Sequence, residues 1–316
     1  MTRRCAILVV TGLTATGCAT PQSRPVSKGV APMFDVLMNV IPRSDAIVFS
    51  TVVETERITV DGKAFVRTKT TVHETYKGLP ARQRIVVIDI PEQGKETPQL
   101  DREMGFVFFL RSTHGRWLPV DLSTPLPVPA ENRNVFLRCI QDYVKVAESK
   151  PDESATKTHA LKMLETRIAF FQTDAARVAL GVSAWEDDQI ERLIGLINGD
   201  ERHDRLRGND KDNLAAIVIG KGKLEKVLPF ARSQLKLGDS DSVYYGLVKR
   251  QGPTVDEMLL SLLRDADRPV QFGALRVAGL LRRREMIDEF EKRNAPRDDL
   301  EMRNAIATAR GLASRE

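Results

Sequence analysis

The sequence predicts a multidomain protein of the β plus α class, in which a β-rich part is followed by an all-α part. Between about residues 44 and 121, apolar and polar residues alternate with a period of two, which is typical of strands with one buried face. From about Asp152 onward, apolar residues recur at spacings of three and four, which is typical of amphipathic helices. The polar, proline-containing stretch KPDESATK therefore predicts a boundary between residues 32–150 and residues 151–316.

The chain begins with MTRRCAILVVTGLTATGCATPQS, which combines two arginines with an apolar run that is too short for a membrane span of about 20 residues. This combination predicts that residues 1–17 are a signal peptide. A signal peptidase accepts small side chains directly before the bond that it cleaves. The residues expected to meet that requirement are Ala15, Thr16 and Gly17.

The sequence ATGC resembles the lipobox of bacterial lipoproteins, which implies that Cys18 is acylated and becomes the mature amino terminus. Ala15 departs from the family, which more often has leucine there. The residue after the cysteine is Ala19 rather than aspartate, which implies the outer membrane if the cell is Gram-negative. The alternative is ordinary secretion, with Cys18 a chance neighbour of the cleavage site.

Residues 18–31 contain two prolines and no apolar period after the cysteine, and we expect a flexible tether. The formal net charge of the whole chain is only +5, and its charged residues are spread along the sequence. A nucleic-acid surface needs clustered Lys and Arg, so no nucleic-acid partner is expected. Acylation of Cys18 would leave Cys139 without a disulfide partner, and its helical setting favours a buried small side chain.

Five strands are expected before the first long helix, over residues 44–60, 63–78, 84–90, 104–111 and 116–121. Asp61-Gly62 predicts a tight hairpin between the first two. In the second strand, one face is expected to be buried, and it carries Val66, Thr68, Thr70, Val72 and Tyr76. Five strands with a flanking helix over residues 130–149 suit a Greek-key barrel of the OB type, although a sandwich is an alternative. The short DG and STHG connections leave such a barrel without long ligand-binding loops.

The segments SDAIVFSTVVE, TTVHETYKG, RIVVIDI and MGFVFFL resemble the netrin-like, tissue-inhibitor-of-metalloproteinase-like OB domain of bacterial exported proteins. Ser50 stands where that family more usually has glycine. Inhibitory relatives block a metalloprotease zinc through a free amino-terminal cysteine packed on the barrel. Because Cys18 is expected to be acylated and tethered, the resemblance does not imply that mechanism here.

Seven amphipathic helices are expected in the second half, over residues 156–172, 173–182, 186–197, 223–237, 254–265, 269–283 and 300–313. The last two share a pattern at an offset of 31 residues, which relates Ala274 to Ala305 and Ala278 to Ala309. This pattern resembles HEAT-like repeats and predicts a short, irregular solenoid. An ordinary helical bundle is the alternative.

The sequence contains few residue patterns that are typical of catalysis. The four histidines are far apart in the sequence, and neither a zinc motif nor a phosphate loop is present, so no metal or cofactor is predicted. The acidic stretch GDERHDRLRGNDKDN, which contains Asp210 and Asp212, lacks the pattern of a calcium loop and is interpreted as a solvated connection.

Two functions are carried forward. The first is a non-catalytic envelope protein that is anchored by lipid on Cys18 and binds an envelope protein through its helical half. Its candidate binding surface is formed by Gln271, Arg276 and Arg303. The alternative is an exported enzyme or enzyme inhibitor with a site at the junction of the barrel and the helices. A carboxylate such as Glu74 or Asp89 would then perform the chemistry.

The lipobox interpretation predicts that Cys18→Ala stalls processing or releases the protein from membranes, because the acylated thiol is lost. Membrane fractionation and mass spectrometry of the mature amino terminus measure both effects. A Cys139→Ala variant is the matched control and should fractionate like the native protein. Unchanged cleavage and fractionation of the Cys18 variant would contradict the lipobox.

Overall fold

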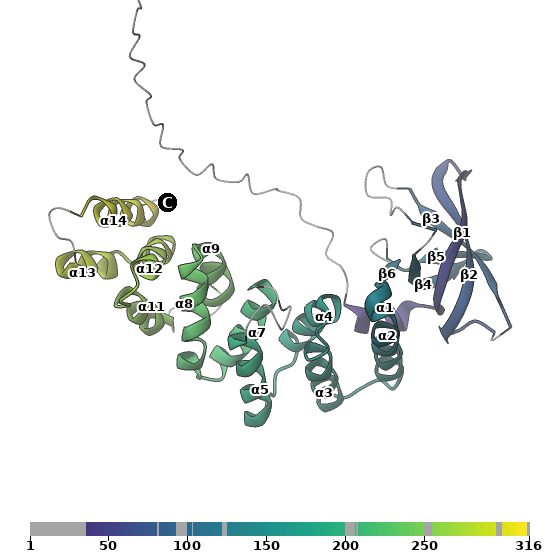
Figure 1. Cartoon of the computed structure of the whole chain (residues 1–316), viewed down its shortest axis with the longest axis horizontal. Helices are drawn as coiled ribbons and strands as arrows, with labels where there is room; N and C mark the ends of the chain where they lie inside the picture. The colour runs from purple at the N-terminus through teal and green to yellow at the C-terminus, as the bar shows by residue number, and fades with distance from the viewer. Residues whose placement is uncertain are drawn as a thin grey trace, which may run out of the picture. The chain divides into compact units, whose positions relative to one another are not determined.

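The structure is a computed structural model, and its fold is a mixed six-stranded sheet followed by helices (Figure 1). The predicted β plus α class is thereby confirmed. Contacts gather residues 34–316 into one compact unit. Ala15, Thr16, Gly17, Cys18 and the tether lie outside the described residues. The structure describes residues 36–80, 82–92, 100–102, 104–121, 125–199, 206, 208–249, 255–294 and 299–314.

All five predicted strands are present, as β1 Ala46–Val60, β2 Lys63–Lys77, β3 Ile85–Pro91, β4 Gly105–Thr113 and β5 Arg116–Pro119. A sixth strand, β6 Leu126–Val128, was not predicted and pairs with β4. Its sequence, LPV, contains a proline, which cannot donate a ladder hydrogen bond and is confined mainly to edge strands.

The strand pairings return to their starting strand. β1 pairs with β2 and with β4, β2 pairs with β3, and β4 pairs with β5, all antiparallel. The circuit is completed by a parallel bridge between Ile88 of β3 and Trp117 of β5. The predicted hairpin is confirmed: Asp61 and Gly62 have φ values of 51° and 73°, as a type I′ turn requires.

The β-rich part contains two hydrophobic clusters on opposite sides of the sheet. One is enclosed by the strands and includes Val48, Ile88 and Phe108. The other contains Ile47, Phe49 and Phe109. Because β1 and β4 contribute alternate residues to the two clusters, their runs AIVF and FVFFL are buried on both faces. On β2, the predicted buried face is confirmed for Thr68, Thr70 and Val72, whereas Val66 and Tyr76 are only partly buried.

The second cluster continues into the helices. Helices α1 Leu37–Arg43 and α2 Arg133–Glu148 pack against each other, and the short 3-10 helix Ala130–Asn132 precedes α2. Phe136 of α2 lies 4.8 Å from Phe171, measured between ring centroids, so this core crosses residue 150. The independent folding of residues 32–150 stays a prediction.

The remaining helices follow in chain order and pack on their neighbours. They are α3 Glu153–Leu164, α4 Ala169–Leu180, α5 Asp187–Asn198, α7 Gly208–Gly220, α8 Leu228–Lys236, α9 Ser240–Ser242, α11 Asp256–Leu263, α12 Arg268–Leu280, α13 Arg284–Asn294 and α14 Leu300–Ala313. A 3-10 turn, Leu224–Lys226, precedes α8, and a π-helix, Val243–Val248, continues α9.

Two sequence predictions in this half are wrong. Residues 156–172 form two helices rather than one, because the chain turns between α3 and α4, where Arg167 has φ 58°. The prediction of a solvated connection around Asp210 and Asp212 is also wrong for the residues from 208 onward. Helix α7 begins there, and both carboxylates are buried.

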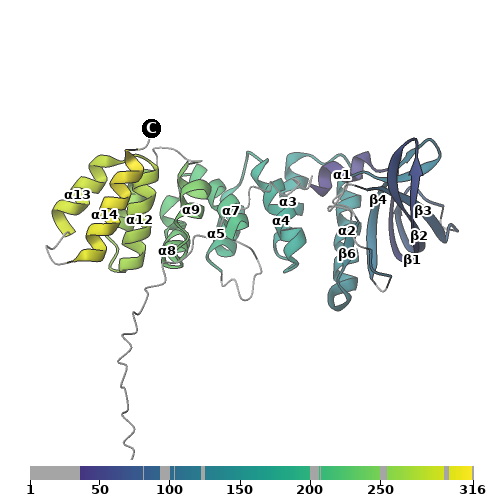
Figure 2. The ribbon, with the colours of Figure 1, turned by 90° about the horizontal axis from the view of Figure 1, so that it is seen from above.

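Small residues bring α12 and α14 close together, as the repeat pattern predicts (Figure 2). Ala274, Ala278 and Ala309 are buried. A Cβ atom added to Gly279 would lie 2.6 Å from the carbonyl oxygen of Ala309, so only glycine fits without movement of the backbone.

Two glycines with the same backbone conformation predict different costs of substitution. Gly78 and Gly62 have φ values of 75° and 73°, and alanine at either position should cost about 1–2 kcal/mol because of this left-handed conformation. At Gly78 the added Cβ would also lie 1.7 Å from the carbonyl oxygen of Asp45, whereas at Gly62 it meets nothing within 4 Å. Denaturant unfolding should show that Gly78→Ala is less stable than Gly62→Ala by about 2 kcal/mol or more, as expected for a steric clash. Equal losses would refute the close contact.

Candidate functional site

Polar side chains gather where the strands and helices meet, but they are buried. The Oδ1 atom of Asp174 on α4 accepts a hydrogen bond from the backbone N–H of Leu37 at 3.0 Å, at the start of α1. The rings of Tyr143 on α2 and His159 on α3 meet edge to face, with their centroids 4.3 Å apart. Their exposed fractions are 0% for Tyr143, 5% for His159 and 3% for Asp174. This group therefore joins α1, α2, α3 and α4 without offering a surface to a substrate.

Burial also sets the protonation of these groups. It raises the pKa of Tyr143 well above its usual value, and the charge of Asp174 acts in the same direction. Burial lowers the pKa of His159 to about 4, despite the opposing effect of Asp142. His159 is thus neutral at pH 7, and its Nε2 atom has no hydrogen-bond partner among the described residues.

The two carboxylates considered for the enzyme alternative lie in different settings. Glu74 is exposed and accepts a hydrogen bond from the Tyr76 hydroxyl at 2.8 Å. Asp89 is 3% exposed and is held by Arg67 Nε at 2.9 Å and by Arg116 Nε at 2.6 Å. Although burial opposes ionisation, hydrogen bonds from the two arginines keep the pKa of Asp89 below its usual value. Asp89 therefore stays charged and paired, as a cross-link between strands.

The buried acids of α7 also hold helices together. Asp210 accepts a hydrogen bond from Thr173 of α4 at 2.7 Å, and Asp212 accepts one from Ser242 of α9 at 2.6 Å. A Cβ atom on Gly246 of the π-helix would lie 2.5 Å from Cγ of Asp212, so glycine is required there. In the described part of the chain, no three His, Cys, Asp or Glu side chains are placed to hold a metal ion. Cys139 is buried, as predicted, and burial raises its pKa to about 11.

The three predicted surface residues have different surroundings. The side-chain amide of Gln271 donates to the carbonyl oxygen of Asp265 at 2.6 Å, within the turn between α11 and α12. Arg276 donates through Nε and a terminal nitrogen to Asp241, at 3.2 and 3.1 Å. Arg303 is exposed on α14. Two of the three side chains thus form contacts inside the protein.

Ion pairs like that of Arg276 recur between helices, and the turns beside them, that are near each other in the sequence. Each pair joins residues 22 to 35 positions apart, and each exposed pair contributes about 0–1 kcal/mol. They include Arg192 with Glu165, Lys223 with Glu191, Arg232 with Asp265, Lys236 with Asp267, Arg268 with Asp299, Arg276 with Asp241, Arg283 with Asp256 and Arg310 with Asp288. We call this set the ion-pair ladder, and it uses much of the charge on this surface.

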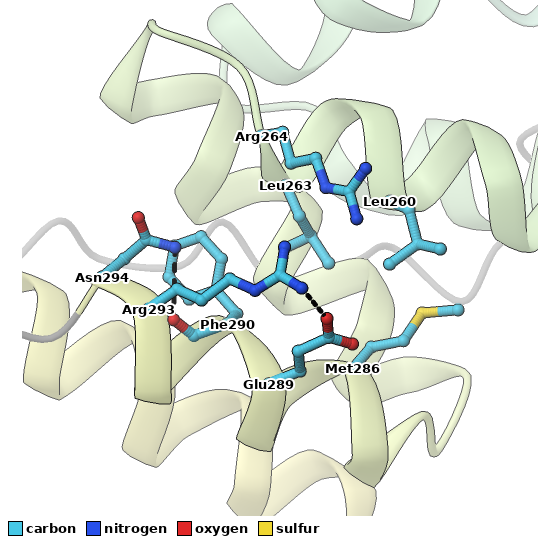
Figure 3. A pocket seen from close by; sticks show the side chains of 8 residues that line it. All are labelled: Leu260, Leu263, Arg264, Met286, Glu289, Phe290, Arg293 and Asn294. Atoms are coloured by element: carbon cyan, nitrogen blue, oxygen red, sulfur yellow. Dashed lines mark hydrogen bonds and ion pairs between the residues drawn. The ribbon is translucent and has the colours of Figure 1, made fainter.

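Shallow hollows lie along the described helices, and three of them bear on function. The largest of these three, about 350 Å³, is lined by Leu180, Trp185 and Ile217, among others. A second, about 200 Å³, lies between the Leu224–Lys226 turn with α8 and helix α11. The third, about 30 Å³, lies between α11 and α13, where Arg264 and Arg293 flank apolar side chains (Figure 3). None of the three is lined by the buried junction residues or by Asp89.

Among the described helices, none combines the length and the apolar character that crossing a bilayer requires. Comparison of the chain with protein-family models, with curated proteins and with solved structures finds no match.

The lowered pKa of His159 predicts a loss of stability in acid. The unfolded chain binds a proton at His159 near pH 6.5, whereas the folded chain does so only near pH 4. The contribution is therefore complete above about pH 6.5 and is lost as the pH falls toward 4, by up to about 3 kcal/mol. Denaturant unfolding from pH 7.5 to 4 should be less pH-dependent in His159→Gln. His114→Asn, at an exposed turn position with φ 50°, is the control. Equal pH slopes in native protein and His159→Gln would contradict the assignment.

Proposed function

We propose that this chain is a non-catalytic, exported envelope protein, anchored by lipid on Cys18, that binds another envelope protein through its helical half. The observation that carries the binding function is the arrangement of the helices. Successive helices leave shallow hollows with apolar floors, whereas the buried titratable groups are engaged in packing. Shallow hollows of this kind suit contact with a partner's side chains, whereas small-molecule sites bury most of the ligand.

The finer fold assignments belong to the same proposal. A strand circuit β1–β2–β3–β5–β4–β1 suits a five-stranded Greek-key barrel of the OB type. Its β1–β2 and β4–β5 turns are two residues each, Asp61-Gly62 and His114-Gly115, so long clasping loops are lacking at both connections. We assign the barrel the role of a spacer or a second contact.

The helical half is proposed to be a short HEAT-like solenoid. Close packing of α12 on α14, the 31-residue offset of their alanines and the ion-pair ladder support this assignment. In a solenoid each repeat contacts its neighbours and leaves an extended surface for a partner. Anchoring at a membrane would confine the protein where envelope partners are concentrated, which raises the effective concentration without new contacts.

The binding function is tested by surface variants of α12 and α14 in the full-length chain. Arg303→Glu and the triple change Gln271→Ala, Arg276→Ala and Arg303→Ala should each reduce capture of a cross-linked envelope partner at least about fivefold, as the loss of about 1 kcal/mol implies. Partners are measured by cross-linking in cells, detergent solubilisation and quantitative mass spectrometry, together with a thermal melt of each variant.

Lys63→Glu, at an exposed position of β2, is the control and should keep the partner. Folded variants of α12 and α14 that retain every partner would contradict the assignment of the binding surface to these two helices. A turnover activity abolished by one carboxylate or histidine substitution would contradict the non-catalytic assignment.

A further inference from the structure

One hollow lies between helix α11 on one side and helix α8 with the preceding Leu224–Lys226 turn on the other, and we call it the acidic groove. We propose that it binds a short segment of the partner that carries a large apolar side chain beside a Lys or Arg. This inference rests on the proposed binding function and names one site and the chemistry of its partner. The groove has a volume of about 200 Å³ and is lined by Leu224, Glu225, Leu228, Glu257, Met258 and Ser261.

The floor of the acidic groove is apolar. Met258 is buried in the core, while Leu224 and Leu228 are partly exposed along the groove. An apolar side chain of the partner would cover these two leucines and remove their exposed surface from water, which is favourable in proportion to the area buried. The volume suits a side chain or two rather than a whole ligand, since ligand pockets typically enclose about 300 Å³ or more.

The charge of the groove is not compensated within the described chain. Glu225 and Glu257 are both exposed, and no described Lys or Arg forms an ion pair with either of them. This sets them apart from the acids of the ion-pair ladder, such as Asp256, which pairs with Arg283 at 3.0 Å. The groove lining contains two carboxylates and no cation. Charge complementarity therefore favours a basic residue on the partner, and an arginine can bind a carboxylate through two parallel hydrogen bonds.

Helix structure alone explains only one of these acids. Glu257 lies in the first turn of α11, where a negative charge stabilises a helix amino terminus. Glu225 lies in a three-residue 3-10 turn, where this stabilisation is small. The two carboxylates come from elements about 30 residues apart in the sequence and meet at the groove only in the folded protein.

The next hollow has the opposite charge and predicts a second charged residue in the segment. Two turns after Glu257 along α11, Arg264 faces the hollow between α11 and α13 and has no ion-pair partner in the described chain, whereas Arg293 pairs with Glu289 (Figure 3). Seven residues of α-helix span about 10 Å, and an extended chain advances about 3.3 Å per residue. A segment that runs along α11 should therefore carry an acidic residue about three positions from its basic residue.

The probe is a fluorescein-labelled nonapeptide with Arg-Leu near its centre, Glu three positions after the Arg, and Ser and Gly elsewhere. Fluorescence anisotropy with purified full-length protein in detergent gives its Kd at 50 and 300 mM NaCl. We expect the native protein to bind this peptide at least tenfold more tightly than a peptide in which Arg and Glu are exchanged. The difference should shrink at high salt, because salt screens exposed charges.

The protein variant is the double change Glu225→Gln and Glu257→Gln, which should weaken binding at least tenfold and remove the preference between the two peptides. Asp188→Gln is the matched control, because Asp188 is the second residue of α5 just as Glu257 is the second residue of α11. It should leave the Kd unchanged. Thermal melts check that each variant is folded.

The result can separate this site from the proposed function. The acidic groove is refuted as a binding site if the peptide fails to bind. It is also refuted if exchanging the Arg and Glu of the peptide, or making the double Gln change in the protein, leaves the Kd unchanged. Loss of envelope partners in the Gln271, Arg276 and Arg303 variants would then still support protein binding elsewhere. If the peptide binds as expected while those variants keep every partner, the groove is supported and the surface on α12 and α14 is refuted.

Discussion

Burial on both faces of the first residues of β1 and of the centre of β4 is the constraint on which the rest of the structure depends. Alternate residues of AIVF and FVFFL face the interior enclosed by the strands, and the others face α1 and α2. The strands alone can bury only one of these sets, since without the helices the second face would leave Ile47, Phe49 and Phe109 in water. The helices therefore complete the β-rich part, and the same hydrophobic cluster extends through them to α14.

The junction of the two parts is closed by polar groups that serve packing. Asp174 binds the first backbone N–H of α1 from a helix 137 residues away in the sequence. A buried carboxylate needs such partners, because an unpaired buried charge is strongly destabilising. The neutral His159 and the buried Tyr143 share this environment, whose low polarity displaces both of their pKa values. Displaced pKa values thus reflect burial here, and they do not accompany an accessible pocket.

Charge on the helical surface is divided between structure and recognition. The ion-pair ladder links helices and turns that are near each other in the sequence, through contacts that are individually weak. Charged side chains that form no ion pair within the chain can form one with a bound partner protein. Glu225, Glu257 and Arg264 are such residues, and they line neighbouring hollows with apolar floors on the two sides of α11. The proposed specificity thus arises from charges that the fold does not use.

The sequence alone determined the elements whose signal is local. Apolar and β-branched runs predict β1, β3, β4 and β5, and alternation predicts β2. Asp61-Gly62 predicts the hairpin, and alanines spaced by four predict the close packing of α12 on α14. Local pattern failed where partners are distant. The start of helix α7 has a polar sequence, but its Asp210, Lys211 and Asp212 are buried against other helices. Strand β6 was not predicted because its sequence contains a proline.

The candidate site divides in the same way. Helical periodicity identified Gln271, Arg276 and Arg303 as polar positions, but only the tertiary structure decided that Arg276 pairs with Asp241 and that Gln271 binds the turn before its helix. The acidic groove was not predictable, because Glu225 and Glu257 are about 30 residues apart and carry no motif. Periodicity reports which face of an element is apolar, whereas pairing between charges on separate helices depends on how those helices pack.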